Sequence, residues 1–183
     1  FPPFKTGGLG TACYGLTKGL SKNGAKVTFV MPVAPDEAKS NFVKIISANR
    51  LAKKIKIRAI PSILTPYMTS ENYETRYNTM AGASSIKDIY GKNLQEEVYR
   101  FSAVAGAIAR EEKHDIIHAH DWMTYNAGIN AKKVSKKPLI LHIHATEFDR
   151  TGGNPNQQIS HIEYTGLKEA DFVIANSQFT KDN

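Results

Sequence analysis

The chain has 183 residues, a length that fits one domain and is sufficient to bury a sizeable core. Its apolar fraction of 41% and charged fraction of 22% are ordinary for a soluble globular protein, and no apolar run reaches the length of a membrane-spanning helix. The net charge of +7 comes from scattered basic residues that are not interleaved with aromatic ones, which argues against a nucleic-acid-binding protein. A single cysteine, Cys13, excludes an intramolecular disulfide and agrees with a cytoplasmic location.

The first predicted element is a glycine-rich loop, Lys5 to Gly10, that leads into a helix over residues 9–23. Glycine lets successive backbone amides converge on one point, and a helix start adds unpaired N–H groups and the positive end of the helix dipole. Lys5 contributes a full positive charge at the start of the loop. These features favour a phosphate site formed by Lys5, Gly7 and Gly8, although an ordinary glycine-rich turn stays open from this stretch alone.

The rest of the chain alternates between strands and helices, which predicts an α/β domain with a doubly wound, mostly parallel, Rossmann-like sheet. Several strands are nearly continuous apolar runs, as expected where helices cover both faces of a parallel sheet. Strands are predicted over residues 26–31 (ended by Pro32), 42–47, 55–60, 115–118, 138–144 and 171–175. Further helices are predicted over residues 94–108, 123–134 and 159–168.

Other segments of the chain are less regular. Asn93 is expected to cap the helix that follows it, and the weakly patterned stretch 61–91 is expected to contain one short helix. The chain begins inside the glycine-rich loop, without the strand that precedes such a loop in an open sheet, and residues 177–183 read as the first turn of a helix. We therefore expect one domain, residues 1–183, that is truncated at both ends.

Polar residues gather at the carboxyl ends of two predicted strands, where ligands bind in open parallel sheets. They are His118, His120, Asp121, His142, His144, Glu147, Asp149 and Arg150. Such groups are costly to leave unpaired next to buried strands, so they form either a satisfied structural network or a binding site. Because a phosphate loop is predicted in the same domain, we favour the binding site.

A metal site is the main alternative for the histidines. Side chains alternate along a strand, so His118 and His120 share one face, as do His142 and His144, and four imidazoles could hold zinc. However, the metallo-hydrolase pattern H-x-H-x-D-H needs its aspartate one residue later than Asp121. One histidine of each pair would also lie in the buried part of its strand, where a hydrogen bond within the core explains it. The sequence therefore predicts no metal site.

Several stretches resemble motifs of glycogen and starch synthases, which are GT-B glycosyltransferases. Residues 5–10 (KTGGLG) match the Lys-x-Gly-Gly-Leu-Gly signature, and residues 1–4 (FPPF) resemble the family's opening loop. Residues 118–122 (HAHDW) resemble the His-x-His-Asp-Trp motif, and residues 143–144 (IH) resemble a later Val-His. Residues 145–150 (ATEFDR) replace the Asn-Leu-Ala-Tyr-Gln-Gly of bacterial synthases and look more like glycosyltransferase family 4 and divergent synthases. The chain is thus identified as resembling the N-terminal domain of a GT-B enzyme over nearly its whole length.

The resemblance implies a retaining glucosyltransferase that moves glucose from ADP-glucose or UDP-glucose to an α-1,4-glucan. It gives His144 contact with the donor sugar and places Asp121 near the sugar hydroxyls or the acceptor, so these two are the predicted catalytic residues. Lys5 and the amides of Gly7 and Gly8 would stabilise the negative charge on the departing diphosphate. Further substrate-binding candidates are His120, Trp122, Glu147, Asp149 and Arg150.

The resemblance also limits the cofactors and partners. Enzymes of this kind are thought to need neither a metal nor an enzymic nucleophile, so we expect no cofactor beside the nucleotide sugar. A C-terminal nucleotide-binding domain is expected outside these residues, and the 183-residue piece alone is expected to be inactive. Partners are a nucleotide sugar and a glucan acceptor, with no nucleic acid and no membrane span, and the oligomeric state stays open. A GT-B transferase with a different acceptor and a non-catalytic glucan-binding module remain alternatives.

Overall fold

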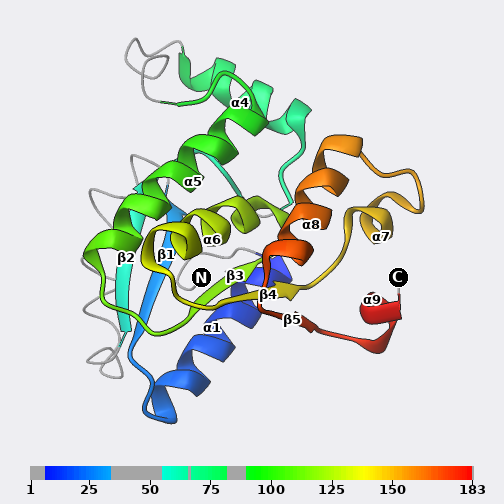
Figure 1. Cartoon of the computed structure of the whole chain (residues 1–183). Coiled ribbons are helices and arrows are strands. Elements are labelled where there is room, and N and C mark those ends of the chain that lie inside the picture. The colour runs from blue at the N-terminus through cyan, green and yellow to red at the C-terminus, as the bar shows by residue number, and fades with distance from the viewer. Residues whose placement is uncertain (1–6, 34–54, 66, 82–89, 183) are drawn as a thin grey trace. The chain divides into compact units, whose positions relative to one another are not determined.

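The computed structural model describes residues 7–33, 55–65, 67–81 and 90–182. The chain divides into two compact units, Phe1–Glu97 and Val98–Asn183. Each unit has its own parallel sheet, with strand order β1-β2 in the first and β3-β4-β5 in the second (Figure 1). Helices flank these sheets, so the predicted α/β class with parallel strands is confirmed and is consistent with a Rossmann-like half of a GT-B fold.

Helix α1 (Gly7–Lys22) opens the N-terminal unit two residues earlier than predicted. Gly7 and Gly8 therefore lie in the first helical turn, where backbone N–H groups need no helical acceptor and glycine is tolerated. The predicted stop is confirmed at Gly24, whose φ of +94° suits glycine better than other residues. Lys5 lies outside the described residues.

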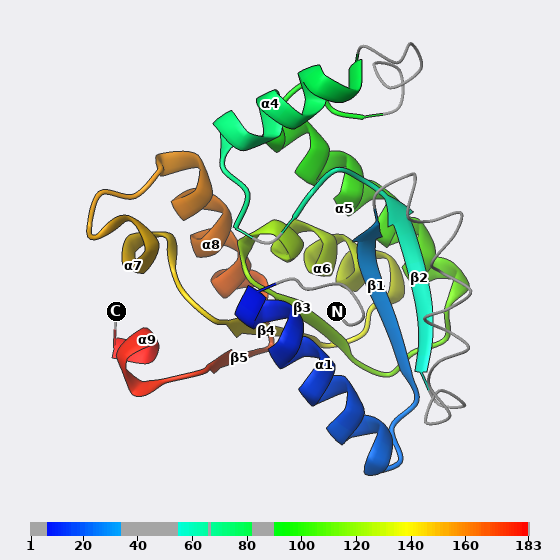
Figure 2. The ribbon, with the colours of Figure 1, turned by 180° about the vertical axis from the view of Figure 1, so that it is seen from behind.

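Strand β1 (Val27–Val33) pairs in parallel with β2 (Ile55–Pro61), and Figure 2 shows the two side by side. The prediction that Pro32 ends the first strand is wrong, because β1 continues through it and Pro32 lies opposite Ile60. Proline fits an extended backbone and lacks only its N–H, so a strand accepts it where the ladder does not use that donor. The predicted strand over 42–47 lies outside the described residues.

Two helices complete the N-terminal unit. The short helix predicted within residues 61–91 is α4 (Ser70–Ala81). Helix α5 (Leu94–Glu111) starts where predicted and crosses the division between the units. Its cap is confirmed, since the side chain of Asn93 accepts a hydrogen bond from the backbone N–H of Glu96 at 2.9 Å.

The C-terminal unit is built around strands β3 and β4, on which helices α6 and α8 pack (Figure 1). Its elements after α5 are β3 (Ile117–His120), α6 (Trp122–Ser135), β4 (Leu139–Ile143), α7 (Glu147–Thr151), α8 (Gln157–Glu169), β5 (Phe172–Ala175) and α9 (Gln178–Asp182). A β-carbon on Gly166 of α8 would lie 2.7 Å from the Tyr125 ring and 3.0 Å from Leu141. Only glycine therefore allows this close approach of α8 to the sheet.

Two details of this unit differ from the sequence prediction. Strand β3 begins two residues later than predicted, because its pairing with β4 starts at Ile117 opposite Leu139 and ends at His120 opposite His142. Helix α7 is not among the predicted helices, and it forms because its first turn is capped by Thr146. None of the helices in the described part of the chain is long and apolar enough to cross a membrane.

Candidate functional site

Four histidine rings gather where β3 and β4 end. His118 and His120 alternate along β3, and His142 and His144 alternate along β4 and just beyond it, so all four can share one face of the sheet. The register places His120 opposite His142, and the ring centroids of neighbouring histidines lie 4.4 to 5.5 Å apart. The sequence predicted the two pairs, and the parallel pairing of the strands turns them into one cluster.

The histidine rings are half-buried, and burial lowers their tendency to carry charge. Burial and the neighbouring histidines lower the pKa of His120 from 6.5 to about 3 and that of His118 from 6.5 to about 4. The pKa of His142 is also lowered by burial, and then by His144. At neutral pH these three rings are therefore uncharged, and they offer hydrogen bonds or metal-binding lone pairs but no positive charge.

One hydrogen bond within the cluster fixes the ring of His144. Nδ1 of His120 lies 3.2 Å from Nε2 of His144, so one of these nitrogens carries the proton and the other accepts it. In the described part of the chain, Nε2 of His118 and Nδ1 of His142 are buried without a hydrogen-bond partner. The expected core hydrogen bonds are thus absent from these two atoms.

Asp121 connects the end of β3 to the end of β4. It is 4% exposed, its Oδ1 accepts a hydrogen bond from the backbone N–H of His144 at 2.8 Å, and its own N–H donates to the carbonyl of His142 at 3.0 Å. Asp121 precedes α6 in the N-cap position, but its side chain makes no cap hydrogen bond. Its backbone has φ 57° and ψ 168°, a strained combination for a residue with a side chain.

The structure therefore brings together the two predicted catalytic residues, Asp121 and His144, with the candidate His120 beside them. Oδ2 of Asp121 is buried and accepts no hydrogen bond from the described residues. Trp122, a predicted substrate-binding residue, is 2% exposed and belongs to the core, so its ring presents no open face in this structure. The catalytic and binding roles of these residues stay predictions.

The other predicted binding residues lie in α7, where they hold one another. Asp149 accepts a hydrogen bond from the backbone N–H of Thr146, and Thr146 accepts one from Asp149 N–H, which forms a capping box. The Arg150 guanidinium donates to Glu147 at 2.9 Å and to Glu163 of α8 at 3.1 Å. These side chains shape the segment after β4, and a role in substrate binding stays a prediction.

Two residues in this region, Glu163 and Tyr125, were not predicted from the sequence to belong to the site. Glu163 accepts the Glu147 N–H as well as Arg150, and burial raises its pKa. Tyr125 is 1% exposed, and burial, followed by the charge of Asp121, raises its pKa. For Tyr125 the sequence held one signal: it lies four residues after Asp121 at the start of a helix, and residues four apart on a helix are neighbours.

The glycine-rich segment belongs to the N-terminal unit. Gly8 is exposed, and a β-carbon placed on it would meet no atom within 4 Å outside its own helix turn. The first N–H groups of α1 have no acceptor within the helix, as at any helix start. Gly7 and Gly8 thus lie where an anion could approach the backbone, whereas Lys5 lies outside the described residues.

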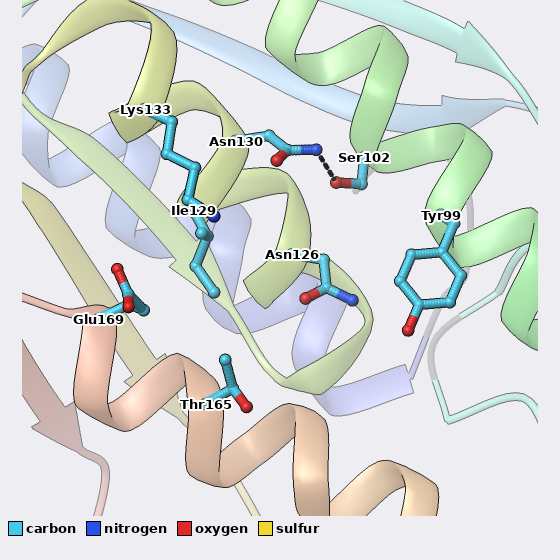
Figure 3. Close-up of a pocket in the computed structure, with 8 residues that line it drawn as sticks. All are labelled: Tyr99, Ser102, Asn126, Ile129, Asn130, Lys133, Thr165 and Glu169. Atoms are coloured by element: carbon cyan, nitrogen blue, oxygen red, sulfur yellow. Dashed lines mark hydrogen bonds between the residues drawn. The ribbon is translucent and has the colours of Figure 1, made fainter.

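A pocket lined mostly by polar side chains lies between α5, α6 and α8 of the C-terminal unit (Figure 3). Its lining residues are Tyr99, Ser102, Asn126, Ile129, Asn130, Lys133, Thr165 and Glu169. Figure 3 shows the Asn130 amide donating to the Ser102 hydroxyl, at 2.7 Å, so part of this polar surface is already paired. The pocket contains none of the predicted site residues, and the strand-end cluster remains the candidate site.

Comparison with known proteins gives consistent matches. The family described as "Starch synthase catalytic domain" matches residues 1–183. An uncharacterized glycosyltransferase of Methanocaldococcus jannaschii is 28% identical over 185 residues, covering 100% of this chain and 39% of the relative. A glycogen synthase of Chlamydia caviae is 32% identical over 195 residues (100% and 38%), and one of Pseudothermotoga lettingae is 29% identical over 165 residues (81% and 32%). The chain thus spans 32% to 39% of the length of these relatives.

Proposed function

Because this chain belongs to the family of starch synthase catalytic domains, we propose that the protein is a glycosyltransferase that moves glucose from ADP-glucose or UDP-glucose to an α-1,4-glucan. The transfer retains the configuration at the anomeric carbon. Relatives named glycogen synthase support the choice of a glucan acceptor.

The observation that carries the proposal is the paired placement of Asp121 and His144. One carboxylate oxygen of Asp121 holds the backbone of His144, and the other is buried and accepts no hydrogen bond from the described residues. A buried carboxylate oxygen without a donor is unfavourable, and a sugar hydroxyl is a donor that would satisfy it. His120 supports the His144 ring from a second side, so the proposed sugar contact is held in place before substrate binds.

The proposed chemistry needs positive charge for the leaving group, and His118 and His120 do not provide it. As the bond between the anomeric carbon and the diphosphate oxygen breaks, negative charge grows on the diphosphate. His118 and His120 are neutral near pH 7 because of their lowered pKa values. We therefore assign charge stabilisation to Lys5 and to the backbone amides of Gly7 and Gly8. No metal takes part in this scheme, so transfer should survive EDTA.

The test is a donor and acceptor panel with the whole protein. Transfer from ADP-glucose and UDP-glucose to glycogen, maltooligosaccharides and unrelated acceptors would be measured for the parent, His144→Ala and Asp121→Asn. Loss of a contact that stabilises the transition state typically lowers turnover by about a hundredfold or more, and both variants should show such a loss. His161→Ala is the matched control, because His161 is exposed on α8. Parent-like transfer by His144→Ala would contradict the proposed site, and transfer only to a non-glucan acceptor would contradict the proposed substrate.

A further inference from the structure

Three imidazoles on neighbouring strands are close enough to share one ion. His118 and His120 on β3 and His142 on β4 each offer a ring nitrogen within 4.8 Å of those of the other two. Parallel pairing fixes this arrangement, since His120 lies opposite His142 in the register. The cluster thus comes from the backbone of two paired strands and not from mobile loops.

Unpaired nitrogens distinguish this cluster from ordinary packing. Stacked neutral rings explain the centroid distances of 4.4 Å between His118 and His120 and 5.5 Å between His118 and His142. Stacking does not explain why Nε2 of His118 and Nδ1 of His142 are buried with no partner among the described residues. Buried polar atoms are nearly always satisfied, and the binding of an ion is one of the recognised reasons for an exception.

The fourth histidine occupies the position of an outer hydrogen-bond partner. A histidine that ligates a metal through one ring nitrogen usually donates its other N–H to a neighbouring acceptor, which fixes the tautomer and the ring. His120 can do this, because its Nδ1 lies 3.2 Å from Nε2 of His144 and its Nε2 remains for an ion. His144 is itself held by Asp121 through its backbone N–H.

We propose that His118, His120 and His142 bind one transition-metal ion of the zinc class, with His144 as the outer hydrogen-bond partner of His120. Three neutral nitrogen ligands select Zn²⁺, Ni²⁺ or Cu²⁺ over Mg²⁺ or Ca²⁺, which prefer oxygen. A tetrahedral zinc site places its ligand nitrogens about 3.3 Å apart, so the rings must close by up to about 1.5 Å when the ion binds. This site revises the expectation from the sequence that no metal ligand set is present, and it does not depend on the proposed transfer reaction.

The test is metal binding by the whole protein after treatment with EDTA and dialysis. Titration with Zn²⁺ in a calorimeter, and with Co²⁺ followed by visible absorption, should show one saturable site. His118→Gln and His142→Gln should each weaken binding at least about tenfold, because loss of even an outer partner costs that much. His161→Gln, on the exposed surface of α8, should bind like the parent.

Two further measurements keep the proposal open to refutation if a variant folds poorly. Circular dichroism would establish which variants retain the fold. X-ray absorption of the zinc-loaded parent needs no variant, and it should show three imidazole nitrogens at about 2.0–2.1 Å. A spectrum with fewer than three imidazoles would overturn the site. So would the absence of saturable binding by the parent, or binding by the folded His118→Gln and His142→Gln variants that is as tight as binding by the parent.

Discussion

Asp121 combines a strained backbone with a side chain that joins two strands, and two substitutions separate these effects. Its φ of 57° and ψ of 168° lie in a region that is nearly restricted to glycine and costs about 1–3 kcal/mol for other residues. Its Oδ1 accepts the His144 N–H, and a hydrogen bond to a charged group contributes about 1.5–3 kcal/mol. The two terms are similar in size and opposite in sign.

The Asp121→Ala variant keeps the strain and loses the hydrogen bond, so its free energy of unfolding should fall by about 1.5–3 kcal/mol. Asp121→Gly loses the same bond but relieves about 1–3 kcal/mol of strain. The greater freedom of glycine in the unfolded chain subtracts about 0.4–1 kcal/mol from that gain. The glycine variant should therefore be more stable than the alanine variant by about 1 kcal/mol.

Urea unfolding of the parent and both variants, followed by circular dichroism, measures these differences. Asp121→Asn is the matched control, since its side-chain oxygen can still accept the His144 N–H and its backbone strain is unchanged. Glucose transfer measured on the same samples should be lost in both the glycine and the alanine variant, whatever their stability. An alanine variant as stable as the glycine variant would refute the argument from strain.

Three other outcomes are expected from substitutions and from a change of pH. Lys5→Ala and Gly8→Val should each lower turnover about a hundredfold, and near-normal rates in both would remove the proposed phosphate-binding role. The space around Gly8 is open, so the valine variant should stay folded. Gly166→Ala should lower the melting temperature, because its new β-carbon would lie 2.7 Å from the buried Tyr125 ring. The control is Gly15→Ala, at an exposed helical position with open space, which should gain about 1 kcal/mol from helix propensity. Equal melting temperatures for the two variants would contradict this packing. The pKa values of His118 and His120 are about 4 and about 3 in the folded protein, below the ordinary 6.5, so as the pH falls these histidines take up protons in the unfolded chain before they do in the folded protein. The free energy of unfolding should therefore fall as the pH drops from 6.5 toward 4. Urea midpoints that stay constant over this range would contradict the prediction.

The regular elements of the fold were predictable because their signals are local. The helices that begin at Leu94 and near Met123 follow from apolar spacing, and the strand around Leu141 follows from an apolar run. The errors have non-local causes. Pro32 remains in β1 because β2 pairs with it, and β3 starts at Ile117 because the register with β4 begins there.

The candidate site was predictable as a list of residues but not as a set of contacts. A period of two places His118 with His120 and His142 with His144, but only strand pairing brings the two pairs together. The resemblance named Trp122 as a substrate-binding candidate, and the structure places it in the core. Spacing could not reveal Glu163 as the partner of α7, since that contact depends on how α8 packs against it.

The way α7 is held has a consequence for the divergence of related enzymes. The capping box of Thr146, the left-handed Gly152 at its end and the ion pairs of Arg150 fix the helix from its own residues and from Glu163. The carbonyl of Phe148 accepts the Gly152 N–H, but its side chain takes no part in the capping box or the ion pairs, and the residue is 52% exposed. A substitution at this outward position can therefore change the surface that α7 presents without breaking the contacts that hold the helix. Substitutions at Arg150 or Glu163 would break those contacts, so fewer of them should be tolerated.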